Sequence, residues 1–295
     1  MSQLVIRPSA IIQYWGCGEA YRLMTTLRIS SIGTSHALAF GTAGHKSALP
    51  FVAAHAQGET VDTVALFEAA WQEQLDNKVL RFSSRDAKDL LDIGKKLAAQ
   101  FPDAWNATGL KAVTTPTGVL VENRLRLKLP DDVILSGEPD IVATKADDPD
   151  GDLVIPDLKF PSGAAFDGFA IASEQLTAYQ TLLQFNLDRF GLKGRRIGQV
   201  GFIEGIKKKG AAWAKMQLAD ARTDEQMGEY ASKVSLTAAL IRKGHFPKQS
   251  GSAYNSPCAT CDVANLCLRK DSTGLTSPLG SVSGLIAAKP TSLAA

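Results

Sequence analysis

The sequence predicts an α/β protein, in which a small mixed central sheet is flanked by helices and preceded by an N-terminal helical insertion. Two periodicities support this fold class. Apolar residues recur at helical spacing over residues 41–56, 61–75 and 86–101, whereas from Gly118 they alternate with polar residues, as in a strand with one solvated face. A hydrophobic content of 45% over 295 residues supplies enough apolar side chains for a sizeable core, which excludes a disordered or fibrous chain.

The composition and the N-terminal residues indicate where the protein is located, whereas the net charge does not identify a partner. The longest uncharged apolar runs fall far short of the roughly 20 residues that a membrane-spanning helix requires, so no membrane association is expected. Residues 1–8 lack the features of a secretory signal, which favours the cytoplasm of a bacterial or phage-infected cell. The 32 Lys and Arg residues against 30 Asp and Glu residues give a net charge of +2, which neither requires nor excludes a polyanionic partner.

The remaining elements follow from the same periodicities. An amphipathic helix capped by Ser9 is expected near the N-terminus, and it carries the first cysteine, Cys17. The turn sequence at 147–151 joins two strands of a meander. Further helices are predicted over residues 169–190 and 224–242, and strands over 119–129, 133–142, 152–160, 196–204 and 212–218.

The chain is expected to form a single domain over residues 1–270. The region around residues 55–115 is helical in pattern and carries no recognisable motif. Residues 271–295 are mostly Ser, Gly, Pro, Ala, Thr and Leu with little periodicity, which predicts a flexible tail.

Charged side chains at the end of an apolar strand indicate a functional site. Of three Asp-x-Lys triplets, those at 76–78 and 86–88 lie in polar helical stretches, where solvated charges are expected. Asp157 and Lys159 instead end an apolar segment, and the two-residue period of a strand points both side chains to one side. Asp140 lies in another apolar predicted strand, where an unpartnered buried carboxylate costs several kcal/mol. A divalent cation shared with Asp157 would supply a partner.

The order of these residues resembles a known enzyme signature. Pro139-Asp140, followed by the triplet Asp157-x-Lys159, resembles the motif of the PD-(D/E)xK nuclease superfamily. The resemblance implies a restriction-endonuclease-like core and a single nuclease domain that hydrolyses phosphodiester bonds in DNA. Three further segments resemble the RecB-like branch in the same order: Gly41-Thr42-Ala43-Gly44-His45, Gly137-x-x-Asp140, and Gln175-x-x-x-Tyr179.

The chemistry of phosphodiester hydrolysis explains these residue types. A divalent ion, Mg²⁺ or Mn²⁺, activates water and neutralises the charge that develops on the phosphate. Asp140 and Asp157 are expected to ligate it, together with the backbone carbonyl of Leu158, and a nitrogen ligand from His45 suits Mn²⁺ better than Mg²⁺. Lys159 is expected to stabilise the pentavalent phosphate and to orient or help deprotonate the attacking water.

Several polar residues have a functional and a purely structural interpretation. Gln175 and Tyr179 share one face of their predicted helix, and the resemblance implies that they hold DNA or the catalytic lysine, whereas Tyr179 could equally pack in the core. Glu122 lies on the solvated face of its predicted strand, where binding a second metal ion is the less favoured interpretation. The other histidines are expected to be ordinary surface or core residues: His36, His55 and His245.

The four cysteines predict a second metal centre. Cys258, Cys261 and Cys267 form a C-x2-C-x5-C pattern, and the fourth is Cys17. Four thiolates suit either structural Zn²⁺ or an iron–sulfur cluster, and a disulfide framework is disfavoured without a secretory signal. The early C-x-x-x-Y-R-L sequence and the late triplet resemble the [4Fe-4S] nucleases of the RecB-like branch, including AddB-type and CRISPR-adaptation nucleases. That resemblance implies a structural [4Fe-4S] cluster that joins the two ends of the domain.

The preferred interpretation is a metal-dependent deoxyribonuclease, an exonuclease on DNA ends or single-stranded DNA in recombination, repair or phage DNA metabolism. Basic residues at 195–196, 207–209 and 242–243 indicate phosphate contacts, and no base-reading motif is visible, so sequence-independent DNA binding is expected. Any helicase or recombination partner would be a separate protein, because the chain lacks helicase motifs. The alternatives are a catalytically silent DNA-binding or assembly subunit, and a zinc enzyme unrelated to nucleic acid.

Overall fold

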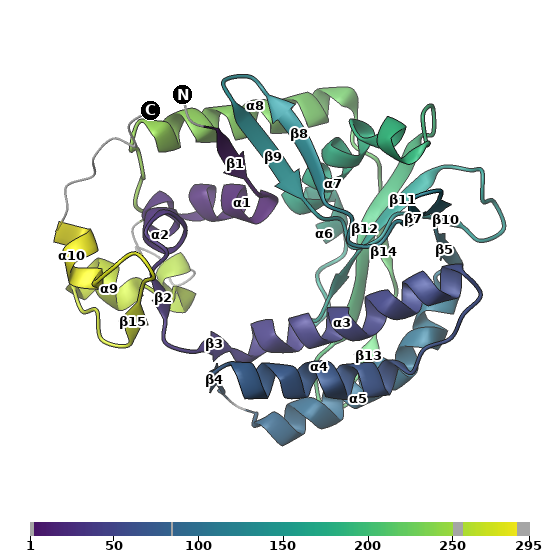
Figure 1. Ribbon diagram of the computed structural model, residues 1–295, viewed down its shortest axis with the longest axis horizontal. Helices are drawn as coiled ribbons and strands as arrows, with labels where there is room; N and C mark the ends of the chain where they lie inside the picture. Colours follow the sequence, from purple (N-terminus) through teal and green to yellow (C-terminus); the bar gives the residue numbers. More distant parts are fainter. Residues whose placement is uncertain (1–2, 84, 250–255, 288–295) are drawn as a thin grey trace. The chain divides into compact units, whose positions relative to one another are not determined.

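The chain forms two compact units, each assembled from segments that are distant in the sequence (Figure 1). The computed structural model describes residues 3–83, 85–249 and 256–287. Unit 1 is formed by the described residues of 1–32, 126–136 and 228–295, and unit 2 by those of 33–125 and 137–227. Within the described residues, no helix is long and apolar enough to cross a membrane.

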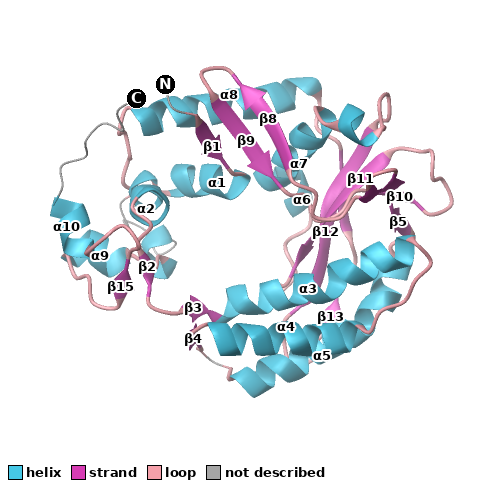
Figure 2. Cartoon of the chain, in the orientation of Figure 1, coloured by secondary structure: helices cyan, strands magenta, loops and turns pink. Residues whose placement is uncertain are grey.

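Unit 2 is built around a six-stranded mixed sheet (Figure 2). The strand order is β13–β12–β11–β10–β5, and β14 also pairs with β12. Its strands are β5 (Leu110–Ala112), β10 (Ala143–Lys145), β11 (Leu153–Lys159), β12 (Ile197–Ile206), β13 (Ala212–Trp213) and β14 (Gln217–Asp220). β11 and β12 run parallel, whereas the other pairs are antiparallel. A parallel pair requires a crossover, and α6 (Phe169–Ala172) and α7 (Glu174–Gln184) provide it.

β11 is the strand on which the predicted site depends. Its residues are buried from Leu153 to Leu158, and Lys159 is the first to reach partial exposure. Pro156 has no N–H to donate, but β10 pairs with β11 through Val154, so Pro156 lies beyond the pairing with that neighbour. β12 follows β11 to its end, where Lys159 lies beside Glu204.

Three helices form a layer against this sheet, and Figure 1 shows them side by side: α3 (His36–Ala56), α4 (Thr63–Asn77) and α5 (Ala87–Ala107). Each begins at a capping side chain that accepts a backbone N–H, namely Ser35, Asp62 or Asp86. Leu158 and Ile203 of the sheet join Val52 of α3 and Phe101 of α5 in one apolar cluster. Burial of each such side chain contributes about 1.5–3 kcal/mol, so this cluster holds α3 against the end of β11.

Unit 1 contains a three-stranded sheet and a set of helices that joins the two ends of the chain. The sheet has the order β1 (Leu4–Ile6), β9 (Val133–Gly137), β8 (Leu125–Leu129), with β1 parallel to β9. The helices are α1 (Pro8–Gly16), α2 (Gly18–Tyr21), α8 (Asp224–Arg242), α9 (Ala264–Arg269) and α10 (Val282–Ala287). The Tyr14 hydroxyl donates to the carbonyl of His245 at 2.6 Å, and Trp15 Nε1 donates to Thr237 Oγ1 at 2.9 Å. These bonds tie α1 to α8 and to the chain that follows it.

Short elements complete the two units. In unit 1, β2 (Ser30–Ser31) pairs with β15 (Leu275–Thr276), a π-helical turn spans Arg22–Thr26, and a 3-10 turn spans Pro257–Thr260. In unit 2, β3 (Thr34–Ser35) pairs with β4 (Leu80–Arg81), β6 (Thr114–Thr115) pairs with β7 (Gly118–Val119), and a 3-10 turn spans Leu187–Phe190.

The mixed α/β architecture confirms the predicted fold class, and four predicted helices are confirmed as α3, α4, α5 and α8. The continuous strand predicted over 119–129 is wrong. Glu122 has a left-handed backbone (φ 49°), which no strand tolerates, so this segment divides into β7 and β8 in different sheets. The predicted meander is also divided, because β9 ends at Gly137 and Asp140 lies in a bend before β10 rather than in a strand.

Two predictions about the chain ends differ from the structure. Ser9 is not the cap of the first helix, since α1 begins at Pro8 with Arg7 at the N-cap position. A proline is well suited to the first helical position because its missing N–H has no intrahelical partner there. Residues 271–287, predicted as flexible, include β15 and α10, whereas residues 288–295 lie outside the described part of the chain.

Candidate active site

The structure brings the predicted catalytic side chains together at one end of β11 in unit 2. Asp157 and Lys159 come from the last residues of the strand, Asp140 from the bend before β10, and His45 from the middle of α3. The Asp157 side chain is only 1% exposed, and Asp140 is also buried. Lys159 reaches solvent, so the site opens where the strand ends.

Two of these residues hold the backbone of Leu158, one at its N–H and one at its carbonyl. Asp140 Oδ2 accepts a hydrogen bond from the Leu158 N–H at 2.7 Å, which fixes the Asp140 carboxylate against β11. His45 Nε2 lies 3.1 Å from the Leu158 carbonyl oxygen, and because a carbonyl only accepts, Nε2 carries the proton in this arrangement. The other ring nitrogen, Nδ1, lies 3.7 Å from Asp140 Oδ1.

Asp140 and Asp157 are both buried, and a buried carboxylate charge costs free energy unless a partner compensates it. Burial, together with the neighbouring charge of Asp157, raises the pKa of Asp140 well above its usual value. Burial lowers the pKa of His45, although the charge of Asp157 opposes that effect. Neither oxygen of Asp157 has a hydrogen-bond partner among the described residues, and Lys159 forms an ion pair with Oδ2. The Lys159 ammonium therefore compensates the buried charge of Asp157, and a cation bound at this carboxylate would replace it.

This donor set fits a divalent cation. Buried carboxylate oxygens are suitable hard ligands for a divalent cation, and the Leu158 carbonyl and the His45 ring lie beside them. Among the described residues, no three His, Cys, Asp or Glu side chains already have the spacing of a bound metal ion. Lys159 forms an ion pair with Asp157, and the His45 N–H donates a hydrogen bond to the Leu158 carbonyl. Both donors must move before a cation can bind these oxygens.

Gln175 and Tyr179 lie on one face of α7, as their four-residue spacing predicts. Gln175 Nε2 donates to the Tyr179 hydroxyl at 2.9 Å. Burial and then the charge of Asp157 raise the pKa of Tyr179, and Asp140 adds to that rise. The Tyr179 hydroxyl thus lies within the field of the active-site carboxylates, which core packing alone would not require.

Two further residues of this region, Glu204 and Phe160, were not identified from the sequence. Glu204 lies beside Lys159 on β12 and is buried, and its carboxylate accepts the Ala165 N–H at 3.2 Å, which anchors the loop that follows β11. Phe160 packs against the His45 ring with centroids 5.8 Å apart. A carboxylate within the apolar run 197–206 was an available signal for Glu204, of the same kind that identified Asp140.

The basic and acidic residues near the site differ in exposure. Lys207, one of the basic residues predicted to contact phosphate, is buried, and its ammonium lies 5.3 Å from the centroid of the Phe40 ring. Burial and then the charge of Arg85 lower the pKa of Lys207, whereas its neighbours Lys208 and Lys209 are exposed. Burial removes Lys207 from the surface on which phosphate contacts were predicted, because a residue beside a strand end can pack under a helix. Glu122 is exposed, as predicted, and its backbone N–H donates to the Asp140 carbonyl at 3.0 Å.

The four cysteines lie in unit 1 as free, partly buried thiols. Burial, and then the charges of the other three cysteines, raise the pKa of Cys261, although no three of the described His, Cys, Asp or Glu side chains have the spacing of a bound metal ion. A Cβ added at Gly18, next to Cys17, would lie 2.6 Å from the Pro247 side chain. Glycine thus allows the early segment to approach the chain that leads to Cys258, Cys261 and Cys267.

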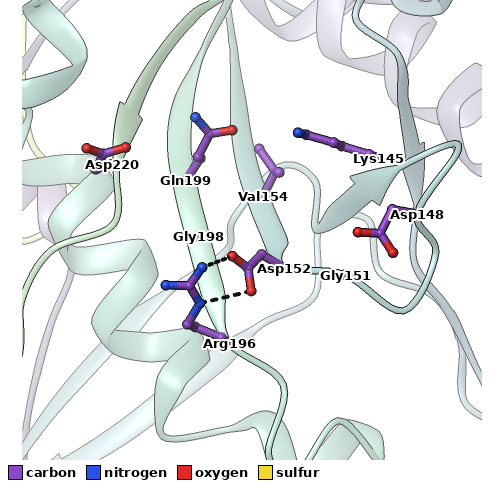
Figure 3. A pocket seen from close by; sticks show the side chains of 9 residues that line it. All are labelled: Lys145, Asp148, Gly151, Asp152, Val154, Arg196, Gly198, Gln199 and Asp220. Atoms are coloured by element: carbon purple, nitrogen blue, oxygen red, sulfur yellow. Dashed lines mark hydrogen bonds and ion pairs between the residues drawn. The ribbon is translucent and has the colours of Figure 1, made fainter.

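A polar cavity of unit 2 does not coincide with this site. It has a volume of about 460 Å³ and is lined by polar residues that include Lys145, Asp148, Asp152, Arg196 and Asp220. Figure 3 shows the two bonds that join Arg196 to Asp152. Asp152 precedes β11, and a seven-residue strand spans about 23 Å, so the cavity lies at the opposite end of the strand from Lys159.

Comparison with known proteins gives a family match and two solved structures. A solved structure from Eubacterium rectale, named "Putative exonuclease", has 13% sequence identity and a TM-score of 0.50, and the alignment covers 97% of this chain and 94% of that chain. The structure of SSO0001 has 12% identity and a TM-score of 0.36, with 92% and 89% covered. None of the curated proteins matches the sequence. The family description "PD-(D/E)XK nuclease superfamily" matches residues 6–268, which is most of the chain. This protein therefore belongs to the PD-(D/E)XK nuclease superfamily.

Proposed function

We propose that this protein is a metal-dependent deoxyribonuclease of the RecB-like branch that hydrolyses phosphodiester bonds at DNA ends or in single-stranded DNA. One observation carries the proposal. The Asp157 carboxylate is buried at the end of β11 without hydrogen bonds among the described residues, and its charge raises the pKa of Asp140. The partly exposed Lys159 forms an ion pair with Asp157. Membership of the nuclease superfamily supports the reaction class, and the name of the structural neighbour supports exonuclease activity.

The residues of the site divide the chemistry between them. Asp140, Asp157 and the Leu158 carbonyl would hold Mg²⁺ or Mn²⁺, and a nitrogen from His45 would favour Mn²⁺. The bound ion supplies a water activated near neutral pH and positive charge next to the phosphate. Lys159, once separated from Asp157, donates to a phosphate oxygen as negative charge develops there. The hydrogen-bonded pair Gln175 and Tyr179 orients Lys159 or the DNA from α7.

Cleavage of linear and circular DNA tests this function. Single-stranded and duplex forms are incubated with Mn²⁺, with Mg²⁺ and with EDTA, and Asp157→Asn serves as the inactive control. Metal-dependent loss of linear strands, with circular strands intact, is expected of an exonuclease. Cleavage of circular strands would overturn the exonuclease assignment, and DNA binding without cleavage would indicate a catalytically silent subunit.

We also propose that Cys17, Cys258, Cys261 and Cys267 hold a structural [4Fe-4S] cluster. Four free, partly buried thiols in unit 1 support this assignment, and the same donors would suit Zn²⁺. Metal and sulfide analysis of anaerobically purified protein distinguishes the two. Brown protein with iron and sulfide supports the cluster, whereas colourless protein with one equivalent of zinc contradicts it.

A further inference from the structure

A row of aromatic rings leads from the catalytic lysine to the surface of unit 2. Lys159 Nζ lies 6.0 Å from the centroid of the Phe202 ring on β12. The Phe169 ring stacks on Phe202 with centroids 5.4 Å apart and planes at 27°, and Phe166 meets Phe169 edge-on at 5.4 Å. Exposure increases outward along this row, from 2% for Phe202 to 38% for Phe169 and 67% for Phe166.

The outer rings contribute little to the core. Phe166 leaves most of its surface in water, and Ile171, which follows on the short helix α6, is likewise exposed. Both belong to the segment that connects the catalytic strand β11 to α7, and α6 packs beside β12 and β14 (Figure 1). A contiguous exposed apolar surface marks a site of interaction more often than a defect of packing. Its connection to Lys159 through Phe202 places that interaction next to the reacting phosphate.

Exposed aromatic rings next to a phosphate-binding site are suited to nucleobases. Base–aromatic stacking contributes about 1–3 kcal/mol per base, and it tolerates any sequence because every base has a π-face. In a duplex the bases already stack on their neighbours and their faces are covered, whereas an unpaired nucleotide offers its face. Such rings therefore favour unpaired strands without selecting a base.

We propose that Phe166 and Phe169 form a base-stacking shelf, which binds an unpaired nucleotide adjacent to the phosphate at the active site. The identity of the occupant rests on the proposed nuclease function. The shelf makes the enzyme prefer single-stranded DNA or frayed ends over paired DNA. A second copy of this chain, or another protein, seated on the shelf would lie beside Lys159 and obstruct the strand, so DNA is the occupant consistent with an active enzyme.

Alanine substitutions of the shelf can be compared with a matched control. The variants are Phe166→Ala and Phe169→Ala, and the control is Phe185→Ala, whose side chain is 66% exposed in the same unit. Phe185 follows α7 ten residues after Gln175, which is about 15 Å along the helix axis. Binding of a labelled thymidine oligonucleotide and of an abasic strand of equal length is measured by fluorescence anisotropy in EDTA, where metal-dependent cleavage does not occur.

The abasic strand separates stacking from all other contacts. Phe166→Ala and Phe169→Ala are each expected to weaken binding of the thymidine strand by about five- to a hundredfold and to leave the abasic strand unchanged. Phe185→Ala should change neither affinity. Phe166→Trp, which keeps a stacking ring, should bind like the wild type, whereas Phe166→Leu, which keeps only apolar surface, should bind like Phe166→Ala.

Three results would overturn the shelf. They are an equal loss on both strands, retained affinity in Phe166→Leu, and a changed oligomeric state with unchanged DNA affinity. A failure of the nuclease function is distinguishable, because it would appear as absence of metal-dependent cleavage by the wild type while the strand-specific binding losses remain.

Discussion

At the residue scale, the ion pair between Lys159 and Asp157 is the feature that any bound cation must replace. Asp157 is buried at the end of an apolar strand, and its oxygens have no hydrogen-bond partner among the described residues. The Lys159 ammonium compensates this charge and reaches solvent at the same time. A lysine in that position can move from the carboxylate to a phosphate when substrate and metal bind.

Replacement of Lys159 tests this exchange. Lys159→Ala should lower the single-turnover cleavage rate by about a hundredfold or more, because its proposed contact forms as charge develops on the phosphate. Mn²⁺ binding, measured by calorimetry, should be retained or tightened, because the ammonium no longer competes for Asp157. Asp157→Asn is the control that should lose both cleavage and metal binding. Wild-type turnover in Lys159→Ala would show that the triplet is not catalytic.

Asp140 predicts a pH-dependent stability of the metal-free protein. Its folded pKa lies above the unfolded value of about 3.9, so folding favours the protonated form and the folded state loses stability as pH rises above that value. Asp140→Asn removes the penalty and keeps an acceptor for the Leu158 N–H. In EDTA, the melting temperature of the variant should therefore exceed that of the wild type, by a margin that grows as pH rises from about 4 toward the raised pKa of Asp140.

Asp152 provides a control of opposite sign at the other end of β11. Its hydrogen bond with Arg196 lowers its pKa, so its stabilising contribution is present above the unfolded pKa and is lost as pH falls. Asp152→Asn should lower the melting temperature slightly at pH 8, because this pair is exposed. A melting temperature of Asp140→Asn below that of the wild type both at about pH 4 and at about pH 8 would contradict the assignment of a buried carboxylate with a raised pKa.

At the element scale, two glycines of α3 have different reasons to be glycine. A Cβ at Gly44 would lie 2.4 Å from the Phe160 ring, whereas a Cβ at Gly41, one turn earlier, would have nothing within 4 Å. Close approach of α3 to the end of β11 therefore requires glycine at position 44. That approach also places His45 beside the Leu158 carbonyl.

Alanine at these two positions should act in opposite directions. Gly41→Ala is expected to stabilise the protein by up to about 1 kcal/mol, because alanine favours the helix and meets no neighbour. Gly44→Ala should destabilise it by about 1–3 kcal/mol and reduce cleavage, because Phe160 must shift against the His45 ring. Urea unfolding and cleavage assays measure both effects. Equal stability and full activity in the two variants would refute the packing argument.

At the scale of the whole molecule, the residues proposed to hold a structural metal centre and those proposed for catalysis belong to different units. The four cysteines belong to unit 1, and Asp140, Asp157 and Lys159 belong to unit 2. Cys17 and Cys258 are separated by most of the chain, so a centre that joins them closes a very long loop. In the loop-entropy picture, such a cross-link contributes several kcal/mol by restricting the unfolded chain.

Loss of one cysteine should therefore affect folding before chemistry. Cys261→Ser is expected to give protein with less bound iron, a lower melting temperature and faster proteolysis, while the folded fraction keeps Mn²⁺-dependent cleavage. Ala259→Ser, at an exposed neighbouring position, should behave like the wild type. Limited proteolysis, metal analysis and cleavage of linear DNA measure the three properties. Full stability of Cys261→Ser would show that no structural centre depends on this thiol.

The sequence by itself determined the features that depend on local spacing. The two-residue interval of Asp157 and Lys159 at the end of an apolar strand, the four-residue interval of Gln175 and Tyr179, and the helices of α3, α4, α5 and α8 are visible from periodicity, and the structure contains them. Local interactions set these patterns because backbone geometry repeats every few residues. The position of the break at Glu122 was not visible, since alternation of apolar residues does not report a left-handed backbone.

Only the tertiary structure decided which distant groups meet. His45 reaches the Leu158 carbonyl because α3 packs on β11 through Gly44 and Phe160, and Asp140 bonds to the Leu158 N–H because the chain bends after β9. Lys207 is buried in a run of lysines because a phenylalanine of α3 lies against it. The Phe166 and Phe169 rings connect to Lys159 through Phe202 of β12. Each of these contacts depends on strand register and on helix packing, and neither is encoded in the spacing of neighbouring residues.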